Sequence, residues 1–343
     1  MHTIKVVVTR NLADEAQTLL DARANELNIV QWRSDQPCER SWLLENVENA
    51  TALLVMVSDR VDEELLQAAG DKLKAVATFT AGTDHIDLEA LKKRNIRLGY
   101  ITDCLSDTVA DFTVMLVLMA QRRGGEAMAK VSRGEWPQIP WHPLLMTGPQ
   151  IRGATVGFLG FGHIAQAALK RLIAFSIKRA IYITSEPRKP VRNDHCGLIK
   201  QSKAGLTIPI EVANNKDQLA SESDIVIVGC ALTPSTKHSI NTNFFDKMKK
   251  TAVIVNIARG PVIDTSALVE ALDQSKIFGA GLDVIENEPN IQADHPILKQ
   301  PRCVLLPHIG SATIETREKM SIESVQNLFA GLAGEAMVNE MEL

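Results

Sequence analysis

Arg259, Glu288 and His308 each follow, by a few residues, an apolar run typical of a buried strand. Ligands of open α/β sheets bind at the carboxyl ends of the strands, so these side chains are placed to meet one. An arginine can hold a carboxylate through two hydrogen bonds, and a histidine can donate a proton to a carbonyl oxygen. A glutamate beside that histidine favours the charged imidazole. Together the three residues predict proton transfer to the carbonyl group of a small carboxylic acid.

Taken alone, each of these residues has a plainer interpretation. An arginine after a strand is commonly a surface or helix-capping charge. A histidine that follows proline is commonly a turn residue, and Glu288, which precedes Pro289, could be a solvated carboxylate. The catalytic interpretation therefore depends on the three residues occurring in this order.

A glycine-rich segment at residues 155–165 (TVGFLGFGHIA) predicts the binding of a dinucleotide. Gly160 permits a tight turn, Gly162 lets the backbone approach the phosphates, and Ala165 lets the following helix pack on the strand. The first turn of that helix offers N–H groups and the positive end of the helix dipole to a pyrophosphate. The apolar run before the motif and the helical spacing after it give the right context, and the alternative is a turn without a ligand.

Two series of alternating strands and helices must position these residues. The first predicts strands at 4–8, 53–57, 75–79 and 96–98 and helices at 13–24, 62–69 and 88–93. The second predicts strands at 156–159, 180–184, 225–228, 253–256, 280–284 and 304–306. Between them lies a long helix predicted over 108–122 that ends at Gly124-Gly125, and then a loop rich in proline and tryptophan at 134–149. The tail from Thr313 is predicted to be a helix that returns to the first domain. Such alternation predicts parallel sheets covered by helices on both faces.

The composition excludes several classes of protein. The 343 residues are 45% hydrophobic and 23% charged, and a net charge of −4 gives no reason to expect nucleic acid or an anionic membrane as partner. Five scattered cysteines without a C-x-x-C pair argue against a disulfide framework or a metal site. The sequence shows neither a signal peptide nor a membrane-spanning run, so we expect a cytoplasmic protein.

Four motifs make the sequence similar to the D-isomer-specific 2-hydroxyacid dehydrogenase family over nearly its whole length. They occupy residues 156–162, 256–260, 281–289 and 306–310. Further stretches, among them 105–108 (LSDT), 141–144 (WHPL) and 307–313 (PHIGSAT), resemble the glyoxylate- and hydroxypyruvate-reducing members of the family.

The resemblance implies roles around the substrate. Arg259 would bind the carboxylate and carbonyl groups of a 2-keto acid, His308 would be the acid/base, and Glu288 would be its partner. Backbone N–H groups at Ala81 and Gly82 would complete the carboxylate site.

The resemblance also implies a homodimer and a set of cofactor contacts. Trp141 matches a tryptophan that reaches the neighbouring subunit's active site in those reductases, and the plainer alternative is packing within the loop. Asp283 would hold the nicotinamide carboxamide. The other residues expected at the cofactor are Gly160, Gly162, His163, Ile164, Thr184, Ser185, Arg188, Cys230, Ala258 and Gly310.

The end of the second strand of the dinucleotide motif favours NADPH over NADH. NAD enzymes usually carry an acidic residue there, about 20 residues beyond the fingerprint, to bind the ribose 2′-hydroxyl. Thr184 and Ser185 stand at that position, and Arg188 with further cations follows closely enough to meet a 2′-phosphate. Glu186 supports NADH as the alternative, since a small shift of the loop would let it act as that acid.

Three features depart from the family pattern. The segment 187–209 is basic and longer than expected, and is either a solvated loop or a cap over the adenosine end of the cofactor. His163 stands where relatives often have arginine, and a neutral histidine contacts phosphate less strongly. Asp111 stands where the family usually has glutamate, so it is open how this position supports the long helix.

We therefore expect an α/β protein with two doubly wound parallel-sheet domains, Rossmann-like and flavodoxin-like, and an active-site cleft between them. The substrate domain would comprise residues 1–104 and 313–343, and the dinucleotide-binding domain residues 105–312. The expected reaction is reduction of glyoxylate to glycolate and of hydroxypyruvate to D-glycerate by hydride transfer from NADPH, with NADH as the second candidate. The alternatives are a phosphoglycerate-, formate- or phosphite-type dehydrogenase and a nucleotide-sensing protein similar to the corepressors of this fold.

Overall fold

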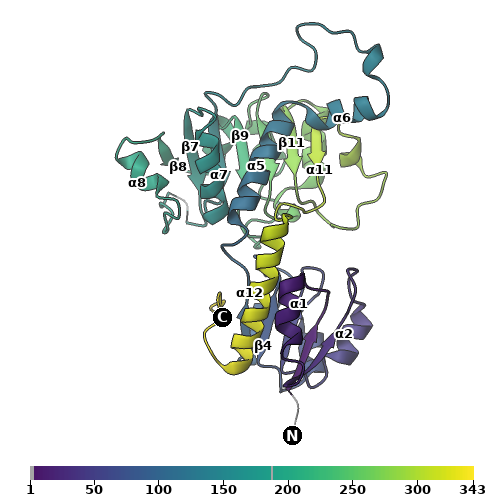
Figure 1. Ribbon diagram of the computed structural model, residues 1–343. Helices are drawn as coiled ribbons and strands as arrows, with labels where there is room; N and C mark the ends of the chain where they lie inside the picture. The colour runs from purple at the N-terminus through teal and green to yellow at the C-terminus, as the bar shows by residue number, and fades with distance from the viewer. Residues whose placement is uncertain (1–3, 187) are drawn as a thin grey trace. The chain divides into compact units, whose positions relative to one another are not determined.

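The computed structural model describes residues 4–186 and 188–343, which fall into two compact units (Figure 1). Unit 1 comprises the residues up to Leu105 together with Ala312–Leu343, and unit 2 comprises Ser106–Ser311. Each unit is built on one sheet in which every pair of neighbouring strands is parallel.

Unit 1 contains a five-stranded sheet in the order β2-β1-β3-β4-β5, which is the flavodoxin-like order. Its strands are β1 (Ile4–Val8), β2 (Leu27–Gln31), β3 (Ala52–Val55), β4 (Ala75–Thr78) and β5 (Arg97–Gly99). Its helices are α1 (Asp14–Asp21), α2 (Arg40–Asn46), α3 (Glu63–Ala69), α4 (Leu88–Lys93) and α12 (Ile314–Ala333). Alternate residues of β1 enter different cores: Val6 and Val8 pack with α1 and α12, and Val7 packs with α2, α3 and α4.

Unit 2 contains a seven-stranded sheet in the order β12-β11-β10-β9-β6-β7-β8. Its strands are β6 (Thr155–Leu159), β7 (Arg179–Ile183), β8 (Ile210–Val212), β9 (Ile225–Val228), β10 (Val253–Asn256), β11 (Gly279–Leu282) and β12 (Cys303–Leu305). Its α-helices are α5 (Ser106–Gln121), α6 (Gly124–Ser132), α7 (His163–Ile173), α8 (Leu198–Lys203), α9 (Lys216–Glu222), α10 (Thr242–Lys247) and α11 (Thr265–Asp273). Helices α5 and α7 cover one face, and α9, α10 and α11 cover the other.

The register of this sheet brings the ends of several strands together. Leu159 of β6 pairs with Val228 of β9, and Asn256 of β10 pairs with both Val228 and Leu282 of β11. The direction of strand order reverses between β6 and β9, and such a switch point is where open α/β sheets bind ligands. Residues that follow these strands are therefore gathered at one edge.

Helix α5 is held against α7 by one arginine. Arg171 of α7 forms ion pairs with Asp107, at 2.9 Å, and with Asp111. Asp111 therefore supports the long helix α5 through its ion pair with Arg171, although the resemblance leads us to expect a glutamate at this position.

The predicted end of the long helix is confirmed, because α5 ends at Gln121, and a separate helix that was not predicted, α6, begins at Gly124. Gly125 serves close packing rather than termination: a Cβ there would lie 3.2 Å from the side chain of Val304 on β12. The ion pair between Arg123 and Glu126, 2.7 Å, supports the first turn of α6.

Strands β2 and β8 and helices α2 and α8 were not predicted. Both strands lie at the edge of their sheets and keep several partly exposed residues, so they lack the continuous apolar run of a central strand. No helix among the described residues is both long and apolar enough to cross a membrane.

Candidate active site

Glu288 and His308, which follow β11 and β12, are in direct contact. The Nδ1 atom of His308 lies 2.9 Å from Oε1 of Glu288, and Oε2 of Glu288 accepts a hydrogen bond from the backbone N–H of Ile285 at 3.0 Å. The side chain of His308 is 40% exposed, so the imidazole is both fixed by a carboxylate and accessible to a ligand. A histidine held in this way is suited to acid/base chemistry.

A buried aspartate holds the turn that carries His308. Both oxygens of Asp283 accept backbone hydrogen bonds, from Ile309 at 2.8 Å and from Gly310 at 2.9 Å. The carbonyl of Asp283 also accepts the N–H of His308 at 2.9 Å. These bonds fix His308 in the left-handed region, at φ 53°, where a residue other than glycine is strained. Burial raises the pKa of Asp283, although the two N–H groups favour its charged form.

Arg259 lies in a tight turn after β10. The side chain of Asn256 bridges this turn, donating to the carbonyl of Arg259 and accepting from the N–H of Ala258, both at 3.0 Å. Gly260 permits a close approach to the segment that leads to Glu288, since a Cβ there would lie 2.0 Å from the backbone of Ile285. Arg259 is partly exposed, and its guanidinium donates to the carbonyl of Ala258 at 2.8 Å.

A second histidine–carboxylate pair, His238 and Glu286, lies beside this group and was missed by the sequence analysis. Their side chains are 2.6 Å apart, and the other oxygen of Glu286 accepts the N–H of Thr265 at 2.9 Å. Burial alone would raise the pKa of Glu286, but the hydrogen bonds from His238 and Thr265 outweigh it and hold the pKa below the ordinary value. The only signal in the sequence was that the segment after β11 carries two acids, of which one had no assigned role.

The glycine fingerprint has the geometry that a dinucleotide requires. Gly160 has φ 88°, and a Cβ there would lie 2.7 Å from the backbone of Cys230, at the switch point between β6 and β9. A Cβ at Gly162 would meet nothing within 4 Å, which leaves open space beside the first turn of α7, where Ile164 lies. Ala165 is buried between helix and sheet. The residues present therefore fit a dinucleotide whose pyrophosphate lies at the start of α7.

The end of β7 carries the residues that bear on the choice of cofactor. The hydroxyl of Thr184 donates to the carbonyl of Glu186 at 3.1 Å, and Ser185 and Arg188 lie at the same strand end. Glu186 forms ion pairs with Lys189 at 2.8 Å and with Arg192 at 2.6 Å, and these two partners lower its pKa. Pro187, the first residue of the predicted basic segment, lies outside the described residues.

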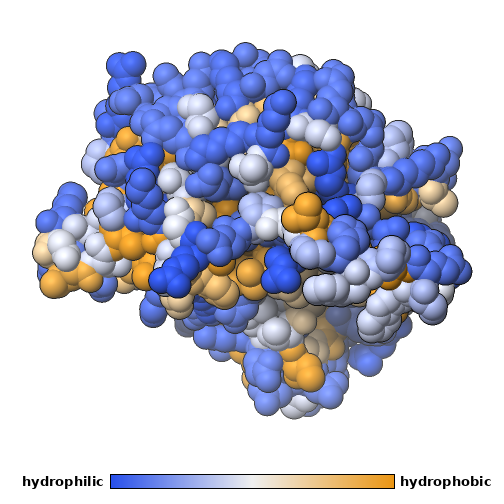
Figure 2. Space-filling view, turned by 90° about the horizontal axis from the view of Figure 1, so that it is seen from above, coloured by the Kyte–Doolittle hydropathy of each residue, from blue (hydrophilic) through white to orange (hydrophobic). Residues whose placement is uncertain are grey.

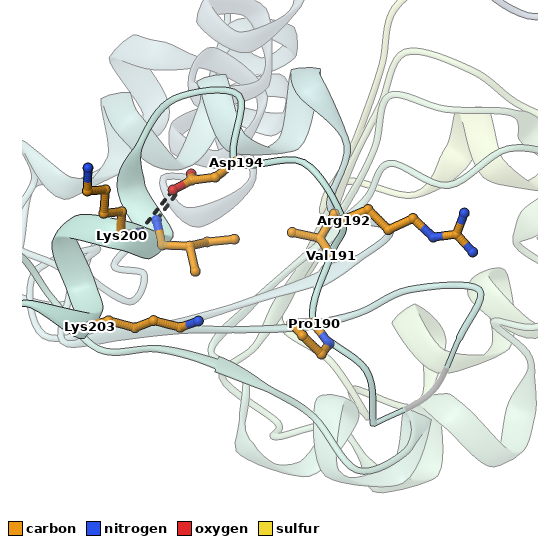
Figure 3. A pocket seen from close by; sticks show the side chains of 7 residues that line it. Pro190, Val191, Arg192, Asp194, Lys200 and Lys203 are labelled. Atoms are coloured by element: carbon orange, nitrogen blue, oxygen red, sulfur yellow. Dashed lines mark hydrogen bonds between the residues drawn. The ribbon is translucent and has the colours of Figure 1, made fainter.

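The basic segment contains a shallow hollow of about 340 Å³. It is lined by Pro190, Val191, Arg192, Asp194, Ile199, Lys200 and Lys203. Figure 3 shows that Asp194 bonds to the first turn of α8 and that the charged ends of Arg192 and Lys200 point away from the hollow. The cations therefore do not converge on one ligand position there.

Ala81 and Gly82 lie in unit 1, in the bend that follows β4. The hydroxyl of Thr80 donates to the carbonyl of Gly82 at 2.7 Å and so fixes the bend. The backbone at these positions is therefore held in a defined conformation at the carboxyl end of a strand.

Trp141 lies on an arm, residues 134–150, that runs from α6 to β6 outside the sheet and its covering helices (Figure 1). Its side chain is 83% exposed, which argues against packing within this chain. Trp136 and Leu144 on the arm are 68% and 75% exposed. Figure 2, which views the molecule from above, shows hydrophobic side chains scattered among hydrophilic ones.

Among the described residues, no group of three or more histidine, cysteine, aspartate or glutamate side chains could hold a metal ion.

Comparison with known proteins agrees with this geometry. Residues 114–310 match the family model of the D-isomer-specific 2-hydroxyacid dehydrogenase NAD-binding domain. The chain is 41% identical to the glyoxylate reductase/hydroxypyruvate reductase of Homo sapiens, over 100% of this chain and 99% of the human protein. A protein of Thermus thermophilus with a solved structure is 36% identical, with a TM-score of 0.84 over 99% of this chain and 100% of that protein.

A second solved structure, an NADPH-dependent glyoxylate/hydroxypyruvate reductase of Sinorhizobium meliloti in complex with NADP and malonate, is 27% identical with a TM-score of 0.78. The alignment covers 99% of this chain and 97% of that one. With the fingerprint, the two parallel sheets and the full-length similarity together, the chain belongs to the D-isomer-specific 2-hydroxyacid dehydrogenase family and is an NAD(P)-dependent oxidoreductase.

Proposed function

We propose that the protein reduces glyoxylate to glycolate and hydroxypyruvate to D-glycerate, with NADPH as the reductant. The observation that carries the proposal is the bonded pair His308–Glu288, at the sheet edge that also holds Arg259 and the glycine fingerprint. Relatives named as glyoxylate reductases support the substrate class, including that of Thermofilum pendens, which is 40% identical over 98% of this chain.

In this proposal each residue has a separate task. Arg259 binds the carboxylate of the 2-keto acid and orients its carbonyl, and the backbone N–H groups of Ala81 and Gly82 complete the carboxylate site. His308 donates the proton to the carbonyl oxygen from Nε2, while Glu288, bonded to Nδ1, fixes the orientation of the ring. The nicotinamide of the bound dinucleotide supplies the hydride.

The cofactor residues are assigned on the geometry of the fingerprint. The backbone of Gly160, Gly162 and Ile164 would hold the pyrophosphate. Asp283 would bind the nicotinamide carboxamide, because its oxygens keep lone pairs that the hydrogen bonds from Ile309 and Gly310 do not use. The remaining proposed contacts are His163, Thr184, Ser185, Arg188, Cys230, Ala258 and Gly310.

NADPH is favoured because no acidic residue stands at Thr184 or Ser185 and cations follow. The ion pairs of Glu186 with Lys189 and Arg192 bear on this choice. They keep the carboxylate beside the two cations, so that a 2′-phosphate would replace Glu186 as their partner. NADH remains the second candidate. Glu186 would accept hydrogen bonds from the ribose hydroxyls once it is released from Lys189 and Arg192.

The first experiment measures oxidation of NADPH and NADH with hydroxypyruvate, glyoxylate and pyruvate offered in turn. We expect turnover of hydroxypyruvate and glyoxylate, and a loss of about 10²–10⁴-fold in kcat for His308→Ala. His295→Gln, in the same unit, is the matched control and should keep its activity. Preference for pyruvate, or for another acid with NADH, would assign a different dehydrogenase of the family. Tight dinucleotide binding without turnover of any acid would indicate the sensing protein instead.

Two substitutions test the choice of cofactor. Ser185→Asp should shift the ratio of kcat/KM for NADPH over NADH by about tenfold or more towards NADH, because a carboxylate repels a 2′-phosphate and accepts from ribose hydroxyls. Glu186→Gln should shift it the other way by freeing Lys189 and Arg192. An unchanged ratio in both variants would contradict this assignment of the strand end.

We further propose a homodimer in which the arm of one subunit contacts the other subunit, with Trp141 close to the partner's substrate. The large exposure of Trp136, Trp141 and Leu144 supports this, since exposed apolar clusters commonly mark association surfaces.

A further inference from the structure

The strap, which we define as residues 188–197 of the basic segment, is bonded to the fingerprint helix. The buried side chain of Gln166 on α7 donates to the carbonyl of Asn193 at 2.9 Å and accepts the N–H of His195 at 2.8 Å. The same amide donates to the carbonyl of Phe161 within the fingerprint turn at 3.0 Å. One buried glutamine therefore ties the strap to the glycine-rich turn.

Two further contacts hold the strap in place. The N–H of Val191 donates to the hydroxyl of Tyr182 at 3.2 Å, and the ring of Tyr182 stacks on that of Phe161, with centroids 4.3 Å apart. Cys196 packs against the buried alanines Ala167 and Ala168 of α7. The backbone of this part of the basic segment is thus bonded to α7 and β7, while most of its side chains are exposed.

The strap brings a second imidazole to the start of α7. The ring of His195 stacks on that of His163, with centroids 4.5 Å apart and planes inclined by 13°. His163 is the first residue of α7 and follows Gly162, beside which there is open space. His195 is exposed, whereas the backbone that carries it is fixed through Gln166.

We propose that His195 is a cofactor-binding residue: the stacked imidazoles of His163 and His195 together bind the pyrophosphate of the dinucleotide. The start of α7 is the place for that pyrophosphate on general grounds, since it combines N–H groups with the positive end of a helix dipole. Imidazole N–H groups add donors there, and a phosphate anion strengthens such bonds. A strap that lies beyond the fingerprint thereby supplies part of the anion site.

This inference rests on dinucleotide binding alone and not on the proposed substrate or on the preference for NADPH. A contact with the pyrophosphate can also be distinguished from a contact with the 2′-phosphate of NADPH. A contact with the 2′-phosphate would affect NADPH only, whereas a contact with the pyrophosphate affects NADPH, NADH and ADP-ribose alike.

The test is equilibrium titration of the intact protein with these three ligands and with 2′-AMP, which lacks the pyrophosphate. His195→Ala should raise the Kd of NADPH, NADH and ADP-ribose by about tenfold and leave that of 2′-AMP within about twofold. His195→Phe keeps a ring for the stack but has no N–H, so it should bind as weakly as His195→Ala. Lys200→Ala, an exposed cation of α8 that points away from the hollow beside the strap, is the matched control and should bind like the wild type.

Four results would overturn the proposal. Recovery of affinity in His195→Phe would mean that only the stack matters. A loss for NADPH and 2′-AMP, with NADH and ADP-ribose unchanged, would place the contact at the 2′-phosphate. An equal loss for all four ligands would make the strap a cap over adenosine. Melting curves of each variant establish that the protein is folded, so that unchanged affinities in a folded His195→Ala protein also contradict it.

Discussion

Three carboxylates at the edge of the sheet in unit 2 differ in what they bond. Glu288 bonds the imidazole of His308, Glu286 bonds that of His238, and Asp283 bonds only backbone N–H groups of Ile309 and Gly310. Asp283 therefore acts on His308 through the shape of the turn, and its charge also interacts with the imidazole. Buried carboxylates that hold a strained turn contribute to chemistry by positioning, because small displacements of a catalytic group are costly.

Asp283→Asn tests this positioning role. An asparagine has one acceptor where the aspartate has two, so the N–H of Ile309 or of Gly310 loses its partner, and the turn is destabilised by about 2 kcal/mol. We expect kcat to fall by about 10–100-fold because His308 is displaced. The Kd of the dinucleotide should change by less than about threefold, because the fingerprint is intact.

Asp273→Asn, on the exposed surface of α11, is the control for this experiment and should match the wild type. If Asp283→Asn weakened the dinucleotide strongly and left kcat unchanged for the bound enzyme, the contact of Asp283 with the nicotinamide would be its main role and the positioning argument would be wrong.

At the scale of elements, the site depends on short segments that follow strands and contact one another. The turn at Gly260 packs against Ile285, and the pair His238–Glu286 joins the segment before Ile240 to the segment after β11. Glu286 also caps the first turn of α11 through Thr265. One carboxylate thus connects three segments around Arg259.

The depressed pKa of Glu286 leads to a prediction about stability and pH. A carboxyl group whose pKa is lower in the folded state stabilises the fold above its unfolded value, here 4.5, and loses that contribution as the pH falls through the folded value. Glu286→Gln should therefore lower the Tm by about 2–4 °C at neutral pH, for a loss of about 1 kcal/mol. The difference from the wild type should shrink as the pH is lowered from about 5 towards 3.5.

Calorimetry of both proteins across this pH range measures the difference. Glu270→Gln removes a carboxylate from the exposed side of α11 and should leave the Tm within error at neutral pH. A gap between Glu286→Gln and the wild type that stayed constant or widened in acid would contradict the assigned direction of the pKa.

The sequence predicted the central elements well because they carry strong local signals. The strands of 4–8, 225–228 and 253–256 are continuous apolar runs, and they coincide with β1, β9 and β10. The fingerprint was recognisable because the positive φ of Gly160 and its close approach to Cys230 require glycine, and the open space beside Gly162 leaves room for a ligand. What local pattern could not reveal are contacts between distant residues, such as His163 with His195 or His238 with Glu286, and glycines whose role is close packing, such as Gly125.

At the scale of the whole molecule, two parallel sheets of different order carry different parts of the expected chemistry. The switch point of unit 2 holds the glycine fingerprint, and unit 1 offers a fixed bend after β4 without a phosphate loop. Every exposed large apolar side chain on the arm lies outside both cores. The arm is thus one part of unit 2 in which large apolar side chains lack an apolar environment within the chain.

The arm leads to the last prediction, which concerns assembly. If a second copy of the chain covers it, the protein should sediment at about twice the chain mass of 37.6 kDa, and Trp136→Ser with Leu144→Ser should shift the equilibrium towards the monomer. Leu206→Ser is a matched control, since that side chain is 78% exposed, about as much as Leu144, but lies outside the arm. Trp141→Ala should keep the dimer and raise the KM for the 2-keto acid by about tenfold, because we propose that Trp141 lies at the partner's substrate and does not hold the subunits together. A wild-type protein that sediments as a monomer at micromolar concentration, with Trp141→Ala unchanged in KM, would show that the arm serves neither purpose.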